Sequence, residues 1–218
     1  MNNITPELLL RAYSVGVFPM AESHAAKEIF FVDPDRRGVI PINSFHVPKK
    51  LKRIIRKKEF TVTYDTAFQS VLNECALTGK KNRRDTWIND KIKELYMALL
   101  EKGFCHSVEV WLENRLVGGL YGVAIGAAFF GESMFSEVSN ASKVALVHLV
   151  AKLKSDGFIL LDTQFNTEHL MQFGAIEIDR KEYQTLLHAA LSMQGHFNSS
   201  SEGFDWIDNF LQSSTQTS

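Results

Sequence analysis

The spacing of apolar residues divides the chain near His106. Upstream, apolar residues recur three or four positions apart, as they do along one face of a helix. This spacing predicts four helices, which begin near residues typical of helix starts: Thr5, Pro48, Asp65 and Asn89. Gly16 and Gly103 are expected to end the first and the fourth of these helices.

From His106 onward, the alternation of apolar and polar residues is typical of strands. The pattern predicts three strands, the first two joined by a hairpin turn at Glu113-Asn114. Their ranges are 106–112, 115–125 and 127–135.

Two further helices and a strand follow these hairpins. The helix at about 140–155 is apolar on nearly all sides, which predicts that it is buried. A short buried strand is expected at 158–162. Asp179 and Glu182 have the spacing of a capping box, which starts the last helix.

This order of elements predicts an α+β fold in three parts. Four of the five prolines lie between Pro19 and Pro48, which indicates turns and short strands in a small N-terminal subdomain, 1–42. The elements of 43–195 are compatible with an acetyltransferase-like (GNAT-like) mixed sheet with packed helices. The polar segment 196–218 is expected to be a flexible tail.

Basic residues are concentrated in two short segments. The net charge of the chain is −1, yet seven of the ten residues in 49–58 are Lys or Arg, and Lys80–Arg84 adds four more. The remainder of the chain is therefore acidic. This segregation indicates a local docking surface for a polyanion.

The composition is ordinary for a globular protein, with 45% apolar and 22% charged residues. Cys75 and Cys105 suggest neither a disulfide framework nor a zinc site, which favours a reducing cytoplasm. No targeting segment is visible, and the longest uncharged run, 116–131, is too short to span a bilayer. The oligomeric state is left open.

A series of short motifs occurs in the order found in one known family. They are Phe18-Pro19-Met20, Asp33-Pro34 with Arg36-Arg37, Phe45-His46-Val47, Thr86-Trp87-Ile88, His106–Glu109, Gly118–Val123, Gly131–Ser136, Ala141-Ser142-Lys143, Asp162–Phe165, and Gly174-Ala175 with Glu177-Ile178. Through these motifs the chain closely resembles the leucyl/phenylalanyl-tRNA–protein transferases over most of its length.

The resemblance implies an aminoacyltransferase. It would move Leu, Phe and, less efficiently, Met from aminoacyl-tRNA to proteins that begin with Arg or Lys, and so mark them for degradation by the N-end rule pathway. An aminoacyl ester is already activated, so no cofactor is required, and no metal-binding motif stands out. The implied location is the cytoplasm, with no membrane partner.

The resemblance assigns the catalytic centre to Asp162 and Gln164. Residues two apart in a strand face the same side, so their side chains are expected to touch. In one scheme Asp162 orients Gln164, whose amide oxygen accepts a hydrogen bond from the attacking amine. In a second scheme the terminal ribose hydroxyl of the tRNA takes the proton, and the sequence leaves both schemes open.

Glu132, Ser133 and Met134 are expected to bind substrate. They lie at the end of a predicted strand, just before a helix start, where backbone N–H groups can hold an oxygen atom. The carboxylate of Glu132 suits a positive group of the acceptor, either its α-amine or its basic side chain.

Apolar and aromatic residues complete the site that the resemblance implies. Leu120, Phe129 and Leu153, with Met134 nearby, are expected to form the donor pocket, which would also tolerate methionine because one methylene discriminates weakly. Two aromatic residues are candidates to stack on the terminal adenine of the tRNA, and a third stands where many members have tryptophan: Trp87, Tyr96 and Phe31.

The basic helix within 49–58 is the expected tRNA-binding surface. By resemblance, Lys49, Arg53 and Arg56 hold its basic positions. Contacts to phosphates carry no sequence information, so tRNAs of different sequence could bind.

Two alternative functions stay open at this point. An acyl-CoA-dependent acyltransferase needs a glycine-rich loop before the buried helix, and Ser136–Lys143 contains no glycine. A tRNA-binding module without catalysis would bind charged tRNA and transfer nothing.

Overall fold

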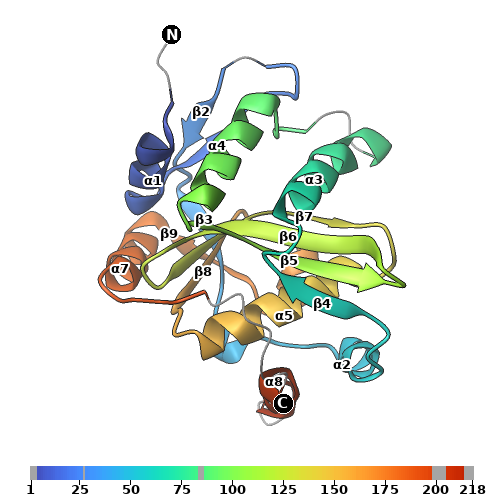
Figure 1. Cartoon of the computed structure of the whole chain (residues 1–218). Helices are drawn as coiled ribbons and strands as arrows, with labels where there is room; N and C mark the ends of the chain where they lie inside the picture. Colours follow the sequence, from blue (N-terminus) through green and yellow to red (C-terminus); the bar gives the residue numbers. More distant parts are fainter. Residues whose placement is uncertain (1–3, 27, 83–85, 198–204, 214–218) are drawn as a thin grey trace.

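The computed structural model describes residues 4–26, 28–82, 86–197 and 205–213. These residues form a seven-stranded sheet with helices on both faces (Figure 1). The strand order is β4 (Thr61–Tyr64), β5 (Cys105–Leu112), β6 (Arg115–Ile125), β7 (Ala128–Ser136), β8 (Leu160–Gln164), β3 (Arg36–Ile40) and β9 (Ile176–Asp179). Neighbouring strands are antiparallel except β7 and β8, which are parallel. The mixed sheet confirms the predicted α+β class.

Each face of the sheet is covered by its own layer of helices (Figure 1). One layer consists of α1 (Pro6–Ser14), α3 (Phe68–Asn82), α4 (Asp90–Glu101) and α7 (Arg180–Leu191). The other consists of α2 (Lys49–Arg56), α5 (Ala141–Ser155) and α8 (Asp205–Ser213). As predicted, α5 is buried over most of its length. Among the described residues, no helix has both the length and the apolar character needed to cross a membrane.

Helix starts follow the predicted caps at three positions. The side chains of Thr5, Asn89 and Asp179 each accept a hydrogen bond from the backbone N–H three residues further on. The predicted cap at Asp65 is wrong, because this carboxylate accepts the backbone N–H of Ser107 at 2.7 Å instead. The partner is on β5, which the local sequence around Asp65 does not reveal.

The N-terminal segment contributes α1 and a two-stranded ribbon of β1 (Phe18–Met20) and β2 (Phe30–Val32). The predicted boundary at residue 42 is wrong, because β3 pairs with β8 and β9 within the main sheet. Val39 and Ile40 of this strand are buried in the two layers of the core. An N-terminal subdomain can therefore extend no further than the residue before Arg36.

Part of the C-terminal segment is folded, contrary to the expectation of a flexible tail over 196–218. In α8, the side chains of Ile207, Phe210 and Leu211 are buried in the same core cluster as α5. Their spacing places them on one face of a helix. This apolar face outweighs the polar composition on which the tail prediction rested.

The parallel pair of β7 and β8 creates the opening for a site. Their pairing stops at Phe130 and Asp162. β7 then continues to Ser136 beside β6, while β8 ends at Gln164 and leads into α6 (Glu168–Met171). The two strands thus separate at their carboxyl ends, which is where sites in sheets with parallel strands commonly lie.

Candidate active site

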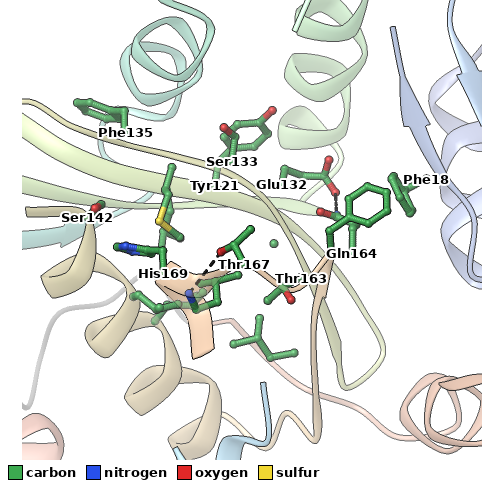
Figure 2. A pocket seen from close by; sticks show the side chains of 18 of the residues that line it. Phe18, Tyr121, Glu132, Ser133, Phe135, Ser142, Thr163, Gln164, Thr167 and His169 are labelled. Carbon is green, nitrogen blue, oxygen red and sulfur yellow. Dashed lines mark hydrogen bonds between the residues drawn. The ribbon is translucent and has the colours of Figure 1, made fainter. Parts of the chain in front are cut away.

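A cavity of about 570 Å³ lies where β7 and β8 separate (Figure 2). Its walls come from the consecutive residues Gly131–Ser136 of β7, the end of β8, α6 and one face of α5. β1, Trp87 and two residues of β6, Leu120 and Tyr121, contribute the remaining lining. The volume is in the range of sites that hold small molecules, about 300–1,000 Å³.

A β-bulge at Glu132 sets the direction of the side chains on β7. Tyr121 and Gly122 are neighbours on β6, but their partners on β7 lie two positions apart, so Glu132 is an extra residue. The bulge reverses the alternation of faces beyond it. Met134 therefore turns toward the α5 side of the sheet and lines the cavity.

The start of α5 lies a few residues beyond the Glu132 motif. Gly131–Phe135 lies inside β7, and α5 begins at Ala141, which agrees with the predicted start near residue 140. Asn140 precedes it with a φ of 72° and makes no side-chain cap; instead, Ser136 Oγ accepts the backbone N–H of Ser142 at 3.2 Å. Oxygen binding by the N–H groups at this helix start stays a prediction.

Glu132 lies at the centre of a polar cluster. Its carboxylate accepts hydrogen bonds from Tyr13 Oη at 2.7 Å, Tyr96 Oη at 2.5 Å and Gln164 Nε2 at 3.0 Å. Burial raises the pKa of Glu132 to about 7, and the hydrogen bonds from the two tyrosines partly oppose this rise. The carboxyl group therefore changes its charge close to neutral pH.

Asp162 is fully buried behind the cavity and is not part of its lining. Arg37 donates to both of its oxygens, from Nε at 2.9 Å and from Nη2 at 2.6 Å, and Tyr183 Oη donates at 2.7 Å. The backbone N–H of Gln164 donates to Asp162 Oδ1 at 2.8 Å. The Asp162 carboxylate therefore contacts the backbone of Gln164 instead of its side chain.

Gln164 ends β8 in a left-handed backbone conformation, with a φ of 57°. Such a conformation is costly for a residue with a side chain, and the bond from its N–H to Asp162 helps to maintain it. The side chain lines the cavity, where Nε2 is held by Glu132 (Figure 2). The amide oxygen is then the end that can accept a hydrogen bond from a bound amine.

Leucine is the most frequent apolar residue in the cavity lining. Leu120 and Met134, both predicted pocket residues, belong to the lining. Four more leucines line it that the sequence analysis missed: Leu146, Leu149, Leu161 and Leu170. The spacing of three between the two on α5 is the only local signal that they share a face.

The structure places Phe129 and Leu153, two other predicted pocket residues, outside this lining. Both are completely buried in the core on the α5 side of the sheet. Leu153 lies about one helical turn beyond Leu149, past the residues of α5 that reach the cavity. Both side chains therefore support the cavity wall from behind.

The three predicted aromatic contacts have different outcomes. Trp87 lines the cavity and remains available to stack on a base. Tyr96 is completely buried, with its ring 5.3 Å from that of Tyr121, so it cannot offer a face to a base. Phe31 lies on β2, is 37% exposed and is not in the lining. Four aromatic residues that were not predicted as contacts line the cavity instead: Phe18, Tyr121, Phe135 and Phe165.

Comparison with known proteins decides the family. A family model described as leucyl/phenylalanyl-tRNA protein transferase matches residues 39–188, and one for the N-terminal domain of that transferase matches residues 2–35. A protein of this name from Nitrobacter winogradskyi is 59% identical over 196 residues, which are 90% of this chain and 87% of the relative. Another, from Paramagnetospirillum magneticum, is 54% identical over 198 residues, which are 91% and 94% of the two chains. The chain belongs to this family.

The fold of this leucyl/phenylalanyl-tRNA protein transferase family member has a counterpart among solved structures. The crystal structure of FemX aligns with a TM-score of 0.54 and 12% sequence identity, covering 82% of this chain and 70% of FemX. At this identity the likeness concerns the fold alone. It shows that this arrangement of a mixed sheet and helices also occurs in FemX.

Three polar atoms in the cavity lining have no hydrogen-bond partner in the part of the chain that the structure describes: Tyr121 Oη, Thr163 Oγ1 and His169 Nε2. Burial and the nearby Lys143 lower the pKa of His169, which favours its neutral form. Because buried polar groups are normally paired, these unpaired atoms depart from the usual pattern.

The helix α2 has the amphipathic character that the sequence predicts. Leu51 and Ile55 are buried in the core, and the three predicted tRNA contacts are exposed: Lys49, Arg53 and Arg56. Lys52 departs from the pattern, because its side chain is buried and this burial, with Arg56 and Lys49 nearby, lowers its pKa. The second basic segment, Lys80–Arg84, lies outside the side chains that the structure describes.

In the described part of the chain, no group of three or more His, Cys, Asp or Glu side chains is arranged to hold a metal ion. Cys75 and Cys105 are both buried and free.

Proposed function

We propose that this chain transfers leucine, phenylalanine and, less efficiently, methionine from aminoacyl-tRNA to the N-terminus of proteins that begin with Arg or Lys. The proposal rests on one observation above all: a single cavity joins a leucine-lined half to the Glu132–Gln164 pair, in a chain of this transferase family. The apolar half suits the donor side chain, and the carboxylate suits a cationic acceptor.

The chemistry is the aminolysis of an ester. The acceptor nitrogen forms a bond to the ester carbonyl carbon, the bond from that carbon to the ribose oxygen breaks, and the ribose oxygen leaves with a proton. Holding the two reactants in one geometry can supply much of the acceleration, so the residues need mainly to bind and orient. The amide oxygen of Gln164 would accept a hydrogen bond from the amine, while Glu132 fixes the amide and attracts the positive acceptor.

Asp162 would act through the backbone in this scheme. It is shielded from the cavity and bonded to the N–H of Gln164, so it sets where the end of β8 lies. Arg37 balances its charge, which suits it to a fixed structural role rather than to proton transfer during the reaction.

Other proposed contacts surround this centre. Leu120 and Met134, with the leucines of α5, would enclose the donor side chain, and Trp87 would stack on the terminal adenine of the tRNA. We further propose that the segment before Arg36 acts as an N-terminal subdomain that completes the site, because Tyr13 contacts Glu132 and β1 contributes to the cavity lining. The reaction would take place in the cytoplasm, where its products enter the N-end rule pathway.

Transfer can be measured directly with radiolabelled Leu-tRNA and a peptide that begins with Arg. We expect label to enter this peptide but not a matched peptide that begins with Glu, because the Glu132 carboxylate repels a second negative charge. Acetyl-CoA should give no product with either peptide. Absence of transfer under conditions in which the Paramagnetospirillum magneticum relative is active would contradict the proposal.

The role of α2 predicts a specific kinetic defect. Simultaneous reversal of Lys49, Arg53 and Arg56 to Glu should raise the KM for aminoacyl-tRNA by about tenfold or more at moderate salt, with little change in kcat. The dependence of log KM on log salt should become shallower by about two units, since about three phosphate contacts are lost.

A matched control uses basic residues on the opposite helix layer. Reversal of Lys91, Lys102 and Lys181 to Glu changes the net charge by the same amount on α4 and α7 and in the short segment that follows α4. These changes should leave the KM for aminoacyl-tRNA nearly unaltered. Equal defects in both triple variants would show that overall charge, not the surface of α2, governs tRNA binding.

A further inference from the structure

The cavity contains a strand edge that is covered by no other strand of the described residues. β8 pairs with β7 only as far as Phe130 and Asp162, yet β7 continues to Ser136 and all six residues of Gly131–Ser136 line the cavity. An exposed strand edge presents backbone N–H and C=O groups that can pair with another chain. Here the edge faces the cavity.

The ladder between β6 and β7 shows which groups face the cavity. The N–H of Glu137 donates to Val117 C=O at 2.8 Å, and the two strands pair with Gly118 opposite Ser136. Because hydrogen-bonded and non-bonded pairs alternate in an antiparallel ladder, the N–H and C=O of Met134 and of Ser136 point away from β6. Among the described residues, no strand pairs with β7 beside Met134, because the pairing with β8 has already ended.

We propose that the acceptor protein binds by adding its first residues to this edge of β7, as a short strand that runs parallel to β7. This inference rests on the proposed function and identifies how the same site recognises its acceptor. An incoming chain in this position takes the place in the sheet that β8 leaves free. Addition of a strand to an exposed edge is a general mode of peptide recognition.

The direction of the added strand follows from the positions of the charged and apolar groups. The reacting amine must lie near Glu132 and Gln164, at the start of the free edge, while the rest of the acceptor must leave the cavity toward the exposed Ser136. A chain that begins near residue 132 and leaves near residue 136 runs parallel to β7. The leucine-lined half, on the α5 side, remains free for the donor.

Parallel pairing assigns each acceptor hydrogen bond. With the second acceptor residue opposite Met134, the N–H of Met134 donates to the carbonyl of the first residue, and the N–H of the third residue donates to the carbonyl of Met134. The N–H of the second residue points away from β7. Recognition by the backbone would also let acceptors of many sequences bind after their first residue.

N-methylation of the acceptor peptide tests this arrangement without altering the protein. In peptides that begin with Arg, N-methylation of the third residue should lower kcat/KM for the acceptor by about tenfold or more, since it removes one hydrogen bond and introduces a methyl group into the strand interface. The matched control, N-methylated at the second residue, should stay within about threefold of the unmodified peptide.

The possible outcomes separate this inference from the proposed function. Equal kcat/KM values for the two methylated peptides, or a loss confined to the second position, would overturn the parallel docking while the unmodified peptide still demonstrates transfer. Failure of all three peptides, including the unmodified one, would overturn the proposed function and this inference together.

Discussion

Asp162→Asn is expected to lower the free energy of unfolding by about 3–5 kcal/mol, because it leaves the positive charge of Arg37 buried without a counterion. Both side chains are almost completely buried, and the two hydrogen bonds between them are 2.6 and 2.9 Å long. Urea denaturation followed by circular dichroism measures the loss. Transfer activity should fall by about a hundredfold. The amide of asparagine has one accepting oxygen, whereas the donors from Arg37, Tyr183 and the Gln164 backbone use two, so the end of β8 should shift.

Two controls distinguish the loss of this buried ion pair from the removal of a negative charge elsewhere. Asp33→Asn breaks an exposed ion pair with Arg180 and should change stability by less than about 1 kcal/mol. The double variant Arg37→Met with Asp162→Leu removes both charges and should recover most of the lost stability, but not the activity. A loss below about 1 kcal/mol for Asp162→Asn alone would contradict the assignment of this pair as a main support of the site.

The sequence could predict elements that depend on nearby residues. The caps at Thr5, Asn89 and Asp179 and the amphipathic face of α2 were all predicted correctly. In each case the interacting groups lie within about one turn of a helix, so spacing alone carries the information. The mixed sheet was predicted as a class, but its strand order was not, because strand partners are distant in sequence.

The parts of the site that were missed depend on such distant partners. Arg37 belongs to a motif noticed in the sequence, yet its contact with Asp162 spans 125 positions and has no local signal. Tyr13 reaches Glu132 across 119 positions in the same way. Tyr183 could not be connected to the site either, because β8 and α7 meet only in the folded chain.

The bulge at Glu132 explains why the direction of the side chains on β7 was not predicted. The polar residues Glu132 and Ser133 interrupt the apolar run of β7, but the extra residue becomes visible only from the register against β6. That one insertion turns Met134 toward the cavity and leaves Glu132 facing Tyr13 and Tyr96. The resemblance to a family could name these residues as substrate contacts, but it could not supply the geometry that gives Glu132 its environment.

Glu132→Gln is expected to stabilise the fold at pH 8 and to impair transfer. Burial raises the pKa of Glu132 from an ordinary 4.5 to about 7 in the folded state. The folded state therefore holds this proton more tightly than the unfolded chain. The stability that the protonated group contributes is fully present below pH 4.5 and is lost as the pH rises to about 7. This loss amounts to at most about 3 kcal/mol, reduced by the partial exposure of the side chain to the cavity.

Glutamine has no such proton to lose, so the variant should lack this decline. The test is the free energy of unfolding at pH 5 and at pH 8. From pH 5 to pH 8, this free energy should decrease by about 1–3 kcal/mol more in the unsubstituted chain than in Glu132→Gln. Glu101→Gln, a change at an exposed position at the end of α4, serves as the matched control and should follow the unsubstituted chain at both values. An identical decline in Glu132→Gln would show that another group causes the pH dependence.

The activity of the same variant should change in the opposite direction. In the unsubstituted chain, ionisation of Glu132 near pH 7 creates the negative charge that attracts the acceptor, so kcat/KM for an Arg peptide should rise between pH 6 and pH 8. Glu132→Gln should be slower by about a hundredfold at pH 8 and by less at pH 6, because only the ionised form differs in charge from glutamine. The ratio of the two enzymes is the decisive quantity, since titration of the peptide amine affects both equally. A ratio that stays constant with pH would mean that the charge of Glu132 does not serve acceptor binding, and that the gain in stability reflects burial alone.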